Sequence, residues 1–304
     1  VNNMNIDQLN NEYGITGQLK FVKGNSGFPF ILVNNASATA LISVYGAQVL
    51  SFQPTNEPED LLFLSQKSHY EEGKAIRGGI PICWPWFGPD PLDINRPDHG
   101  FVRNGLWSVL ATEASSEYET KIKLRFQNTK QSESYWQQAF TLDLEISVGG
   151  TLTLELITRN TGIEVFSITQ ALHAYFSVGD ISDVQILGLE NAHYLYKLDD
   201  GEEKNQSGAL IIANEVDRIY TNVNNELIID DRYFNRQIVI TSTNNKTTVI
   251  WNPWIDICAQ MPDLAYDDYQ RFICVEPGNV DTDVVDIPAG GQYHLITNFK
   301  IIRN

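Results

Sequence analysis

The sequence predicts an all-β protein, a large antiparallel β-sandwich or barrel that forms a single domain over residues 1–304. Two observations carry this prediction. Segments of alternating apolar and polar residues recur along the chain between Gly, Asn and Asp, and no long stretch has the period of an amphipathic helix. Hydrophobic residues make up 42% of the chain, which is enough for a substantial core and inconsistent with disorder.

The clearest predicted element is a β-hairpin over residues 141–158, TLDLEISVGGTLTLELIT. Apolar residues occupy every second position on both sides of Gly149 and Gly150, a pair able to form a two-residue turn with positive φ. One face of this hairpin is therefore expected to lie on the core.

Similar alternation predicts further strands at 121–127 (KIKLRFQ), 237–243 (QIVITST) and 247–254 (TTVIWNPW), with a closing strand in HLITNFKII, residues 294–302. The pair Asn244-Asn245 supplies a turn between two of these strands. The most polar stretch, residues 197–209 (KLDDGEEKNQSGA), is predicted to be an exposed loop.

The charge balance restricts the class of ligand. A net charge of −17 repels a polyanion, so nucleic-acid binding is excluded, and an anionic ligand would need a local cluster of the 21 Lys and Arg residues. No apolar run is long enough for a bilayer, and the start VNNMNIDQLNNEYG lacks the pattern of a secretory signal. We expect a cytoplasmic protein without a membrane partner.

The cysteines indicate reduced thiols. Cys83, Cys258 and Cys274 are odd in number and show no CxxC pairing, which favours a cytosolic protein without a disulfide framework. They also lack zinc-ligand spacing with the five histidines, so no metal site is predicted from the sequence.

Residues 77–90, RGGIPICWPWFGPD, form an unusual segment. Pro81, Pro85 and Pro89 exclude a helix and disfavour a central strand. In a structural interpretation, its aromatic rings anchor a rigid turn. In a functional one, Trp84 and Trp86 offer a flat surface to a sugar ring beside an anion-binding Arg77. The segment alone does not decide between the two.

Three further segments carry candidate residues. DHGFVRNGLW (98–107) places His99 and Arg103 after a Pro-rich turn, in a setting that suggests a site, although such an Arg is commonly only solvated. QALHAYFSVGD (170–180) sets His173 in an apolar strand, where a histidine is more often a core residue than a general acid.

Glu276 has the strongest claim to a catalytic role from the residues alone. It ends the apolar run of YQRFICVEPGNVDTD (269–283), where a charge is costly unless it is used or paired. A catalytic base is one reading, and a buried salt bridge with Arg271 is the other. Spacing along the chain does not show whether Glu276 meets any of the histidines.

Taken together, these segments resemble the aldose 1-epimerase (galactose mutarotase-like) superfamily, and specifically its glucose-6-phosphate 1-epimerase, or hexose-6-phosphate mutarotase, branch. The matching pieces run in family order from residue 75 to residue 280: AIRGGIPICWPWFGP, DHGFVRNGLW, ALHAYFSVGDI, VIWNPW and RFICVEPGNV. The resemblance implies a large β-sandwich of the supersandwich type that interconverts the α and β anomers of a hexose 6-phosphate, with no metal or organic cofactor.

The resemblance also implies residue roles. Glu276 would take the proton of the anomeric hydroxyl, and His173 would protonate the ring oxygen. His99 would bind the sugar or assist at that oxygen, Arg77 and Arg103 would hold the phosphate, and Asp217 of NEVDRIY would bind sugar hydroxyls. The segment VEPGN has Asn279 where the branch has a histidine.

Two alternatives to this function stay open. One is an aldose 1-epimerase for unphosphorylated sugars, in which Arg77 and Arg103 are structural. The other is a non-catalytic sugar-phosphate-binding module on the same fold. A glycoside hydrolase is disfavoured because no second carboxylate has a setting like that of Glu276. We expect a monomer whose only partner is its small-molecule substrate.

Overall fold

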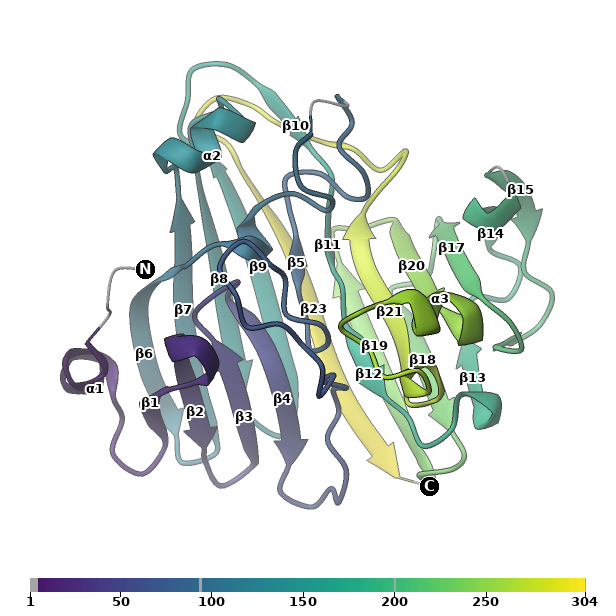
Figure 1. Ribbon diagram of the computed structural model, residues 1–304, viewed down its shortest axis with the longest axis horizontal. Coiled ribbons are helices and arrows are strands. Elements are labelled where there is room, and N and C mark those ends of the chain that lie inside the picture. Colours follow the sequence, from purple (N-terminus) through teal and green to yellow (C-terminus); the bar gives the residue numbers. More distant parts are fainter. Residues whose placement is uncertain (1–4, 93–94, 200, 304) are drawn as a thin grey trace.

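The computed structural model describes residues 5–92, 95–199 and 201–303. Its strands form three large antiparallel sheets and a small one (Figure 1). Nine strands make the longest sheet, in the order β16 (Leu210–Ile211), β13 (Val184–Leu187), β18 (Glu226–Asp231), β19 (Arg236–Thr243), β23 (Gln292–Arg303), β9 (Leu152–Asn160), β8 (Phe140–Val148), β7 (Glu119–Gln127) and β6 (Ser108–Ser116).

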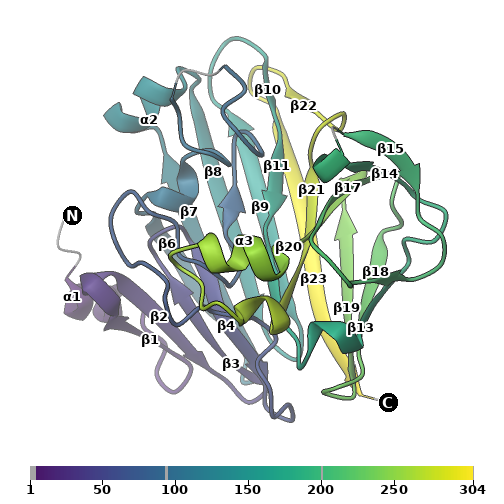
Figure 2. The same cartoon turned by 45° about the vertical axis from the view of Figure 1, so that its right-hand side comes forward.

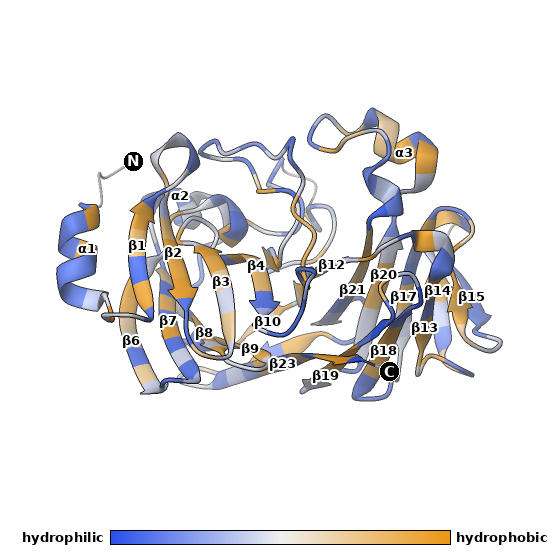
Figure 3. Ribbon diagram, turned by 90° about the horizontal axis from the view of Figure 1, so that it is seen from below, coloured by the Kyte–Doolittle hydropathy of each residue, from blue (hydrophilic) through white to orange (hydrophobic). Residues whose placement is uncertain are grey.

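Two further sheets pack on this long sheet. The first consists of β1 (Leu19–Lys23), β2 (Pro29–Asn34), β3 (Ala38–Ser43) and β4 (Gln48–Pro54). The second runs β15 (Glu202–Asn205), β14 (His193–Tyr196), β17 (Val216–Thr221), β20 (Thr247–Asn252), β21 (Phe272–Asn279), β11 (Gln170–Leu172) and β5 (Ile82–Cys83), with β12 (Tyr175–Ser177) also paired to β21. Figure 3 shows both on the same side of the nine-stranded sheet. The smallest sheet pairs β10 (Phe166–Ile168) with β22 (Val285–Ile287).

Helices are few and short. They are α1 (Ile6–Tyr13), α2 (Lys130–Tyr135) and α3 (Trp254–Gln260), with 3₁₀ turns η1 (Asn25–Gly27), η2 (Val102–Asn104), η3 (Ile181–Asp183), η4 (Lys197–Asp199) and η5 (Asp268–Gln270). Figure 2 shows α3 in front of the sheets, away from the core. None of the helices in the described part of the chain is long and apolar enough to cross a membrane. The predicted all-β, antiparallel fold is confirmed.

The predicted strands are found, with differences at the hairpin turn and at the end of the segment 247–254, where β20 stops at Asn252 and α3 begins at Trp254. Residues 141–158 lie in β8 and β9, whose inward side chains are buried because alternate positions face the core. The last cross-strand pair is Val148 with Leu152, so three residues form the connection, and neither Gly149 nor Gly150 has a positive φ. The predicted two-residue turn is therefore wrong by one residue, since Thr151 belongs to the connection.

The stretch 197–209 also differs from its prediction. It begins with η4 and contains the edge strand β15, which pairs with β14. Most of its residues are exposed, as expected, but Lys197 lies against the cavity described next. The loop interpretation was wrong because polar edge strands lack the apolar alternation on which it was based.

Candidate active site

A cavity of about 410 Å³ lies at the eight-stranded sheet. It gathers residues that are far apart in the sequence, and its lining comprises Arg77, Phe87, Gly88, Pro89, Asp98, His99, Arg103, His173, Lys197, Asp217, Val249, Trp251 and Glu276. Six of the eight candidate site residues are among them. The two exceptions are Trp84 and Trp86.

Strand register explains why His173 and Glu276 meet. Residues Ala171 and Tyr175 pair with Gly278 and Cys274 of β21, in the same register on either side of His173. His173 therefore lies opposite Glu276, and directly opposite residues of an antiparallel pair point to the same face of the sheet. The Nδ1 atom of His173 is 3.3 Å from Oε1 of Glu276.

The same face continues across the neighbouring strands. In β20, Val249 pairs with Glu276, and Trp251 pairs with Asp217 of β17. Tyr196, the last residue of β14, pairs with Arg218, so the next residue, Lys197, comes beside Asp217. His173, Glu276, Asp217 and Lys197, which lie in or next to strands of this sheet, therefore come to one surface.

Burial shapes the proton affinities of the central pair. Glu276 is almost fully buried and its Oε2 atom has no hydrogen-bond partner among the described residues. Desolvation, helped by the nearby negative charge of Asp217, holds the pKa of Glu276 well above its usual range. Desolvation, His99 and the cations Arg103 and Arg77 hold the pKa of His173 well below its usual range. Glu276 does not pair with Arg271, so the alternative of that salt bridge is corrected.

His99 is fixed by the backbone of the loop that faces it. Its main chain has a φ of 61°, its N–H donates to the carbonyl of Gly88, and its Nδ1 accepts from Gly88 N–H at 3.2 Å. An Nδ1 that accepts leaves the ring proton on Nε2, as a donor. Burial, then Arg103, lowers the pKa of His99 to about 3, so the ring is neutral. Its centroid lies 5.8 Å from that of His173.

Glycine permits the close approach of these two loops. Gly100 has a φ of 74°, and a Cβ built there would lie 1.8 Å from the carbonyl oxygen of Trp84. Gly79 also permits a close approach, because a Cβ built there would lie 2.2 Å from the carbonyl oxygen of Val49. Gly79 therefore serves packing between protein segments.

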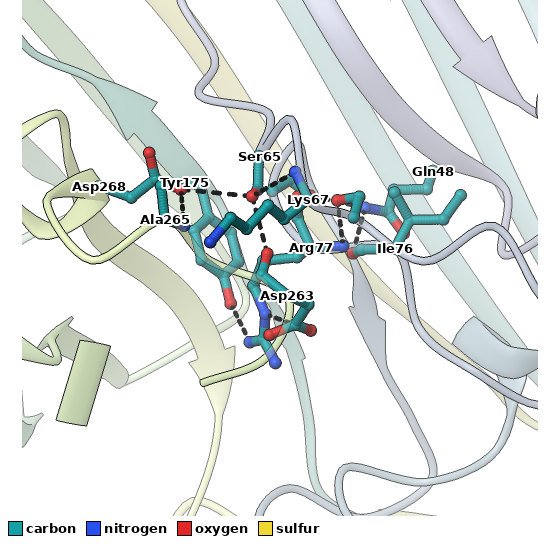
Figure 4. A network of polar contacts seen from close by, with 11 residues as sticks. Gln48, Ser65, Lys67, Ile76, Arg77, Tyr175, Asp263, Ala265 and Asp268 are labelled. Atoms are coloured by element: carbon teal, nitrogen blue, oxygen red, sulfur yellow. Dashed lines mark hydrogen bonds and ion pairs between the residues drawn. The ribbon is translucent and has the colours of Figure 1, made fainter. Parts of the chain in front are cut away.

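The three cationic side chains of the cavity differ in the hydrogen bonds and ion pairs that they form. Figure 4 shows the Arg77 guanidinium between a phenol and a carboxylate: its Nε lies 3.0 Å from Oδ2 of Asp263, and its Nη1 donates to the Tyr175 hydroxyl at 2.8 Å. Arg103 donates from Nη2 to the carbonyl of Asp98 at 2.9 Å, and its buried Nε has no partner among the described residues. Lys197 places its Nζ 5.6 Å from the centroid of the Phe87 ring.

Trp84 and Trp86 are buried and do not line the cavity, which favours the structural interpretation over the sugar-binding one. Trp84 is fully buried and donates from its indole nitrogen to Thr158 Oγ1 of β9. Trp86 donates to the carbonyl of Pro97 and carries the guanidinium of Arg96 over its ring. The aromatic rings that line the cavity are Phe87 and Trp251.

Sequence reasoning missed Lys197, Phe87 and Trp251 as lining residues. Phe87 and Trp251 lie in segments that were singled out, but nothing in the sequence distinguishes their rings from Trp84 and Trp86. Lys197 lies at the cavity because β14 pairs with β17, and no pattern in the sequence reveals that pairing. Asn279, the departure from the resembling pattern, lies outside the cavity, where it donates to the Asn244 carbonyl and accepts from Gln170.

Comparison with known proteins shows the family of the chain. The aldose 1-epimerase family matches residues 29–300. A protein of Salmonella typhimurium named "Putative glucose-6-phosphate 1-epimerase" is 36% identical over 249 residues, which cover 81% of each chain. An Escherichia coli protein of the same name is 34% identical over 276 residues, which cover 90% of each chain.

Solved structures support the fold as well. A crystal structure described as a "putative mutarotase (YeaD)" from Salmonella typhimurium has a TM-score of 0.89 at 30% identity and covers 96% of both chains. A galactose mutarotase-like protein from Clostridium acetobutylicum, 16% identical, has a TM-score of 0.74, covers 94% of this chain and 98% of its own, and shows the fold alone. The chain belongs to the aldose 1-epimerase family, and it is an epimerase of the mutarotase type.

Proposed function

We propose that the protein interconverts the α and β anomers of D-glucose 6-phosphate and related hexose 6-phosphates. The observation that carries this proposal is one cavity that holds a buried His–Glu pair together with Arg77, Arg103 and Lys197. A neutral sugar needs no such cluster, whereas a phosphate dianion approaching a protein of net charge −17 does. The names of the Salmonella typhimurium and Escherichia coli relatives point to the same substrate.

The reaction needs only proton transfers. Glu276 takes the proton of the anomeric hydroxyl while protonated His173 gives its proton to the ring oxygen, the C1–O5 bond breaks, and an open-chain aldehyde forms. Rotation about C1–C2 turns the other carbonyl face toward the C5 hydroxyl. On reclosure, the C5 hydroxyl returns a proton to His173, and Glu276 returns one to the former carbonyl oxygen. Both groups end as they began.

The electrostatics of the cavity make the charged forms of both groups costly and therefore reactive. A carboxylate with a raised pKa is a strong base, and an imidazolium with a lowered pKa is a strong acid. Arg77 and Arg103 lower the proton affinity of His173, so a bound phosphate dianion that neutralises them favours protonation of His173. The phosphate in this proposal both anchors the substrate and helps to charge the acid.

The remaining lining residues have supporting roles in the proposal. His99 offers an Nε2 proton to a sugar oxygen, and Asp217 accepts from sugar hydroxyls. Phe87 and Trp251 offer apolar surface to the C–H groups of the ring.

One observation favours a second candidate, an epimerase for unphosphorylated aldoses. The charge of Arg77 is already balanced by Asp263, in a contact that a purely structural arginine would also make. A preference for the phosphorylated sugar would then depend on Arg103 and Lys197, because neither is joined to a carboxylate by an ion pair within the described residues.

The test is anomer exchange followed by NMR, for glucose 6-phosphate and for glucose, with wild type, Glu276→Gln and Arg103→Ala. Arg232→Ala, which removes a surface guanidinium exposed by 62%, is the matched control. We expect acceleration that prefers the phosphate ester, a fall of about 10²- to 10⁴-fold in Glu276→Gln, and loss of the preference in Arg103→Ala alone. Acceleration of neither sugar would leave only a binding module, and equal acceleration of both would favour the second candidate.

A further inference from the structure

A second chemical possibility lies beside the His–Glu pair. His173, Cys274 and Glu276 are buried, and one ligand-type atom from each lies within 4.8 Å of the others. Cys274 and Glu276 are two residues apart in β21 and so share a face of the sheet. Cys274 pairs with Tyr175, the residue whose ring stacks on His173 with centroids 4.8 Å apart. Three strand-borne ligands therefore converge, although their spacing along the sequence did not suggest a site.

Two atoms of this cluster have their hydrogen-bonding capacity unused. Nδ1 of His173 and Oε2 of Glu276 are buried without a hydrogen-bond partner in the described part of the chain. Nδ1 is near Oε1 of Glu276, at 3.3 Å, without the geometry of a hydrogen bond. Buried polar atoms left in this way are costly, and a cation is one partner that satisfies a nitrogen and a carboxylate oxygen at the same time.

We propose that His173, Cys274 and Glu276 form a binding site for a thiophilic divalent cation of the zinc type. Zinc binds imidazole, thiolate and carboxylate at about 2.0 to 2.3 Å in a tetrahedron, which places ligand atoms roughly 3.3 to 3.8 Å apart. The present separations need to contract by about 1.5 Å at most, within reach of side-chain rotation. His173 and Glu276 line the cavity, so water or a sugar oxygen there would complete the coordination.

Charge balance favours a divalent ion over a monovalent one. A neutral imidazole, a thiolate and a carboxylate neutralise two positive charges, and the protons of Cys274 and Glu276 leave through the cavity as the metal enters. Asp217 adds attraction, while Arg77 and Arg103 oppose it. Because of this opposition we expect binding weaker than that of a structural zinc site, and therefore reversible by chelators.

Occupation of the site has a consequence for activity, which rests on the proposed function. The metal would take the same His173 and Glu276 atoms that are proposed to move protons, so zinc would inhibit anomer exchange. Cys274 binds the metal in this proposal but has no part in the proton transfers, and it does not line the cavity. Substitution of Cys274 should therefore remove the inhibition by zinc and leave the rate of anomer exchange without metal unchanged.

The primary test measures binding, without reference to activity. Chelator-stripped protein is titrated with Co²⁺, and zinc is then added in competition, for wild type, Cys274→Ala, Cys274→Ser and Cys258→Ala. Cys258 is the matched control, since it is another fully buried thiol but not one of the three ligands. We expect one metal per chain with a thiolate-to-cobalt charge-transfer band in wild type and Cys258→Ala, and affinity at least about 100-fold weaker in both Cys274 variants.

Several results would overturn the metal site: no charge-transfer band in the wild type, an undiminished band in folded Cys274→Ala or Cys274→Ser, or loss of the band in Cys258→Ala. A wild-type spectrum without the band overturns the site even if one Cys274 variant fails to fold, and the other Cys274 variant then tests the ligand. In a second arm, zinc should suppress exchange in wild type and Cys258→Ala but spare Cys274→Ala. Metal binding without inhibition would keep the site and count against the proton-transfer roles, whereas inhibition without binding at Cys274 would count against the site.

Discussion

Glu276 is a residue placed where its charge is disfavoured, and that placement gives it both its chemistry and a cost to folding. Its pKa is raised first by burial and then by Asp217. In the unfolded chain, the carboxyl ionises near its ordinary pKa of 4.5, while the folded protein resists ionisation. The stabilising contribution of this group is therefore complete below about pH 4.5 and is lost as the pH rises through the folded-state pKa.

This linkage makes Glu276→Gln a stabilising substitution at alkaline pH. Glutamine has nearly the same shape and no charge to desolvate, so at pH 8 the free energy of unfolding should rise by about 1 to 3 kcal/mol relative to wild type. The gain should shrink toward pH 5. Urea unfolding at both pH values measures it, with Glu226→Gln, at an exposed position of β18, as the control. A gain that is the same at pH 5 and pH 8 would contradict the origin in ionisation.

Lys197 is the residue whose role the structure adds to the sequence prediction. It faces the cavity beside Phe87 and, unlike Arg77, has no ion-pair partner in the described residues. Lys197→Ala should therefore raise KM for glucose 6-phosphate about tenfold, in line with the loss of about 1.5 kcal/mol for one charge-assisted hydrogen bond, and leave glucose turnover unchanged. Steady-state kinetics on both sugars measure this, with Lys130→Ala at the start of α2 as control. An equal effect on both sugars would mean that Lys197 acts on the shape of the cavity and not on the phosphate.

The sequence predicted individual strands better than it predicted which residues of different strands come into contact. The strands β8 and β9 follow from alternation within residues 141–158, because side-chain burial on one face has a local signature. His173 and Glu276 were each singled out locally, but their contact depends on the register between β12 and β21, which are separated by about a hundred residues. The same limit explains Lys197, whose place depends on the pairing of β14 with β17.

At the scale of elements, the active site depends on two loops that touch through Gly100. The loop after β5 and the segment before η2 meet where Trp84 forms a bridge with Gly100, one residue after His99. Gly100→Ala would put a methyl group into the Trp84 carbonyl at a φ of 74°. We expect a loss of at least about 1 kcal/mol in stability and a larger proportional loss of activity, because His99 moves with the loop.

Gly150→Ala is the control for this prediction. A Cβ at Gly150 meets nothing within 4 Å, and its φ is not positive, so its effect on stability should stay within about 0.5 kcal/mol. Thermal unfolding and anomer exchange of both variants make the comparison. If Gly100→Ala keeps full activity, the loop contact does not position His99.

At the scale of the whole molecule, we infer that the chain folds as one domain. One continuous hydrophobic cluster includes Phe21 of β1, Leu144 of β8, Ile186 of β13 and Val275 of β21, so it joins all three large sheets. The cavity is built on one of these sheets and closed by loops that pack on the others. Local loss of one sheet would therefore expose the core of its neighbours.

This inference predicts coincident unfolding transitions. Trp84 and Trp107 lie in loops near the nine-stranded sheet, and Trp251 lies in β20 of the eight-stranded sheet. A Trp251→Phe variant therefore lacks the fluorescence of the tryptophan that lies in a strand of the eight-stranded sheet. In urea, its fluorescence, the wild-type fluorescence and far-UV circular dichroism should each give a single transition, with one midpoint for the two signals of each protein. Two midpoints in either protein would indicate that the eight-stranded sheet and its cavity unfold separately, and the active site would then be carried by a module less stable than the rest of the protein.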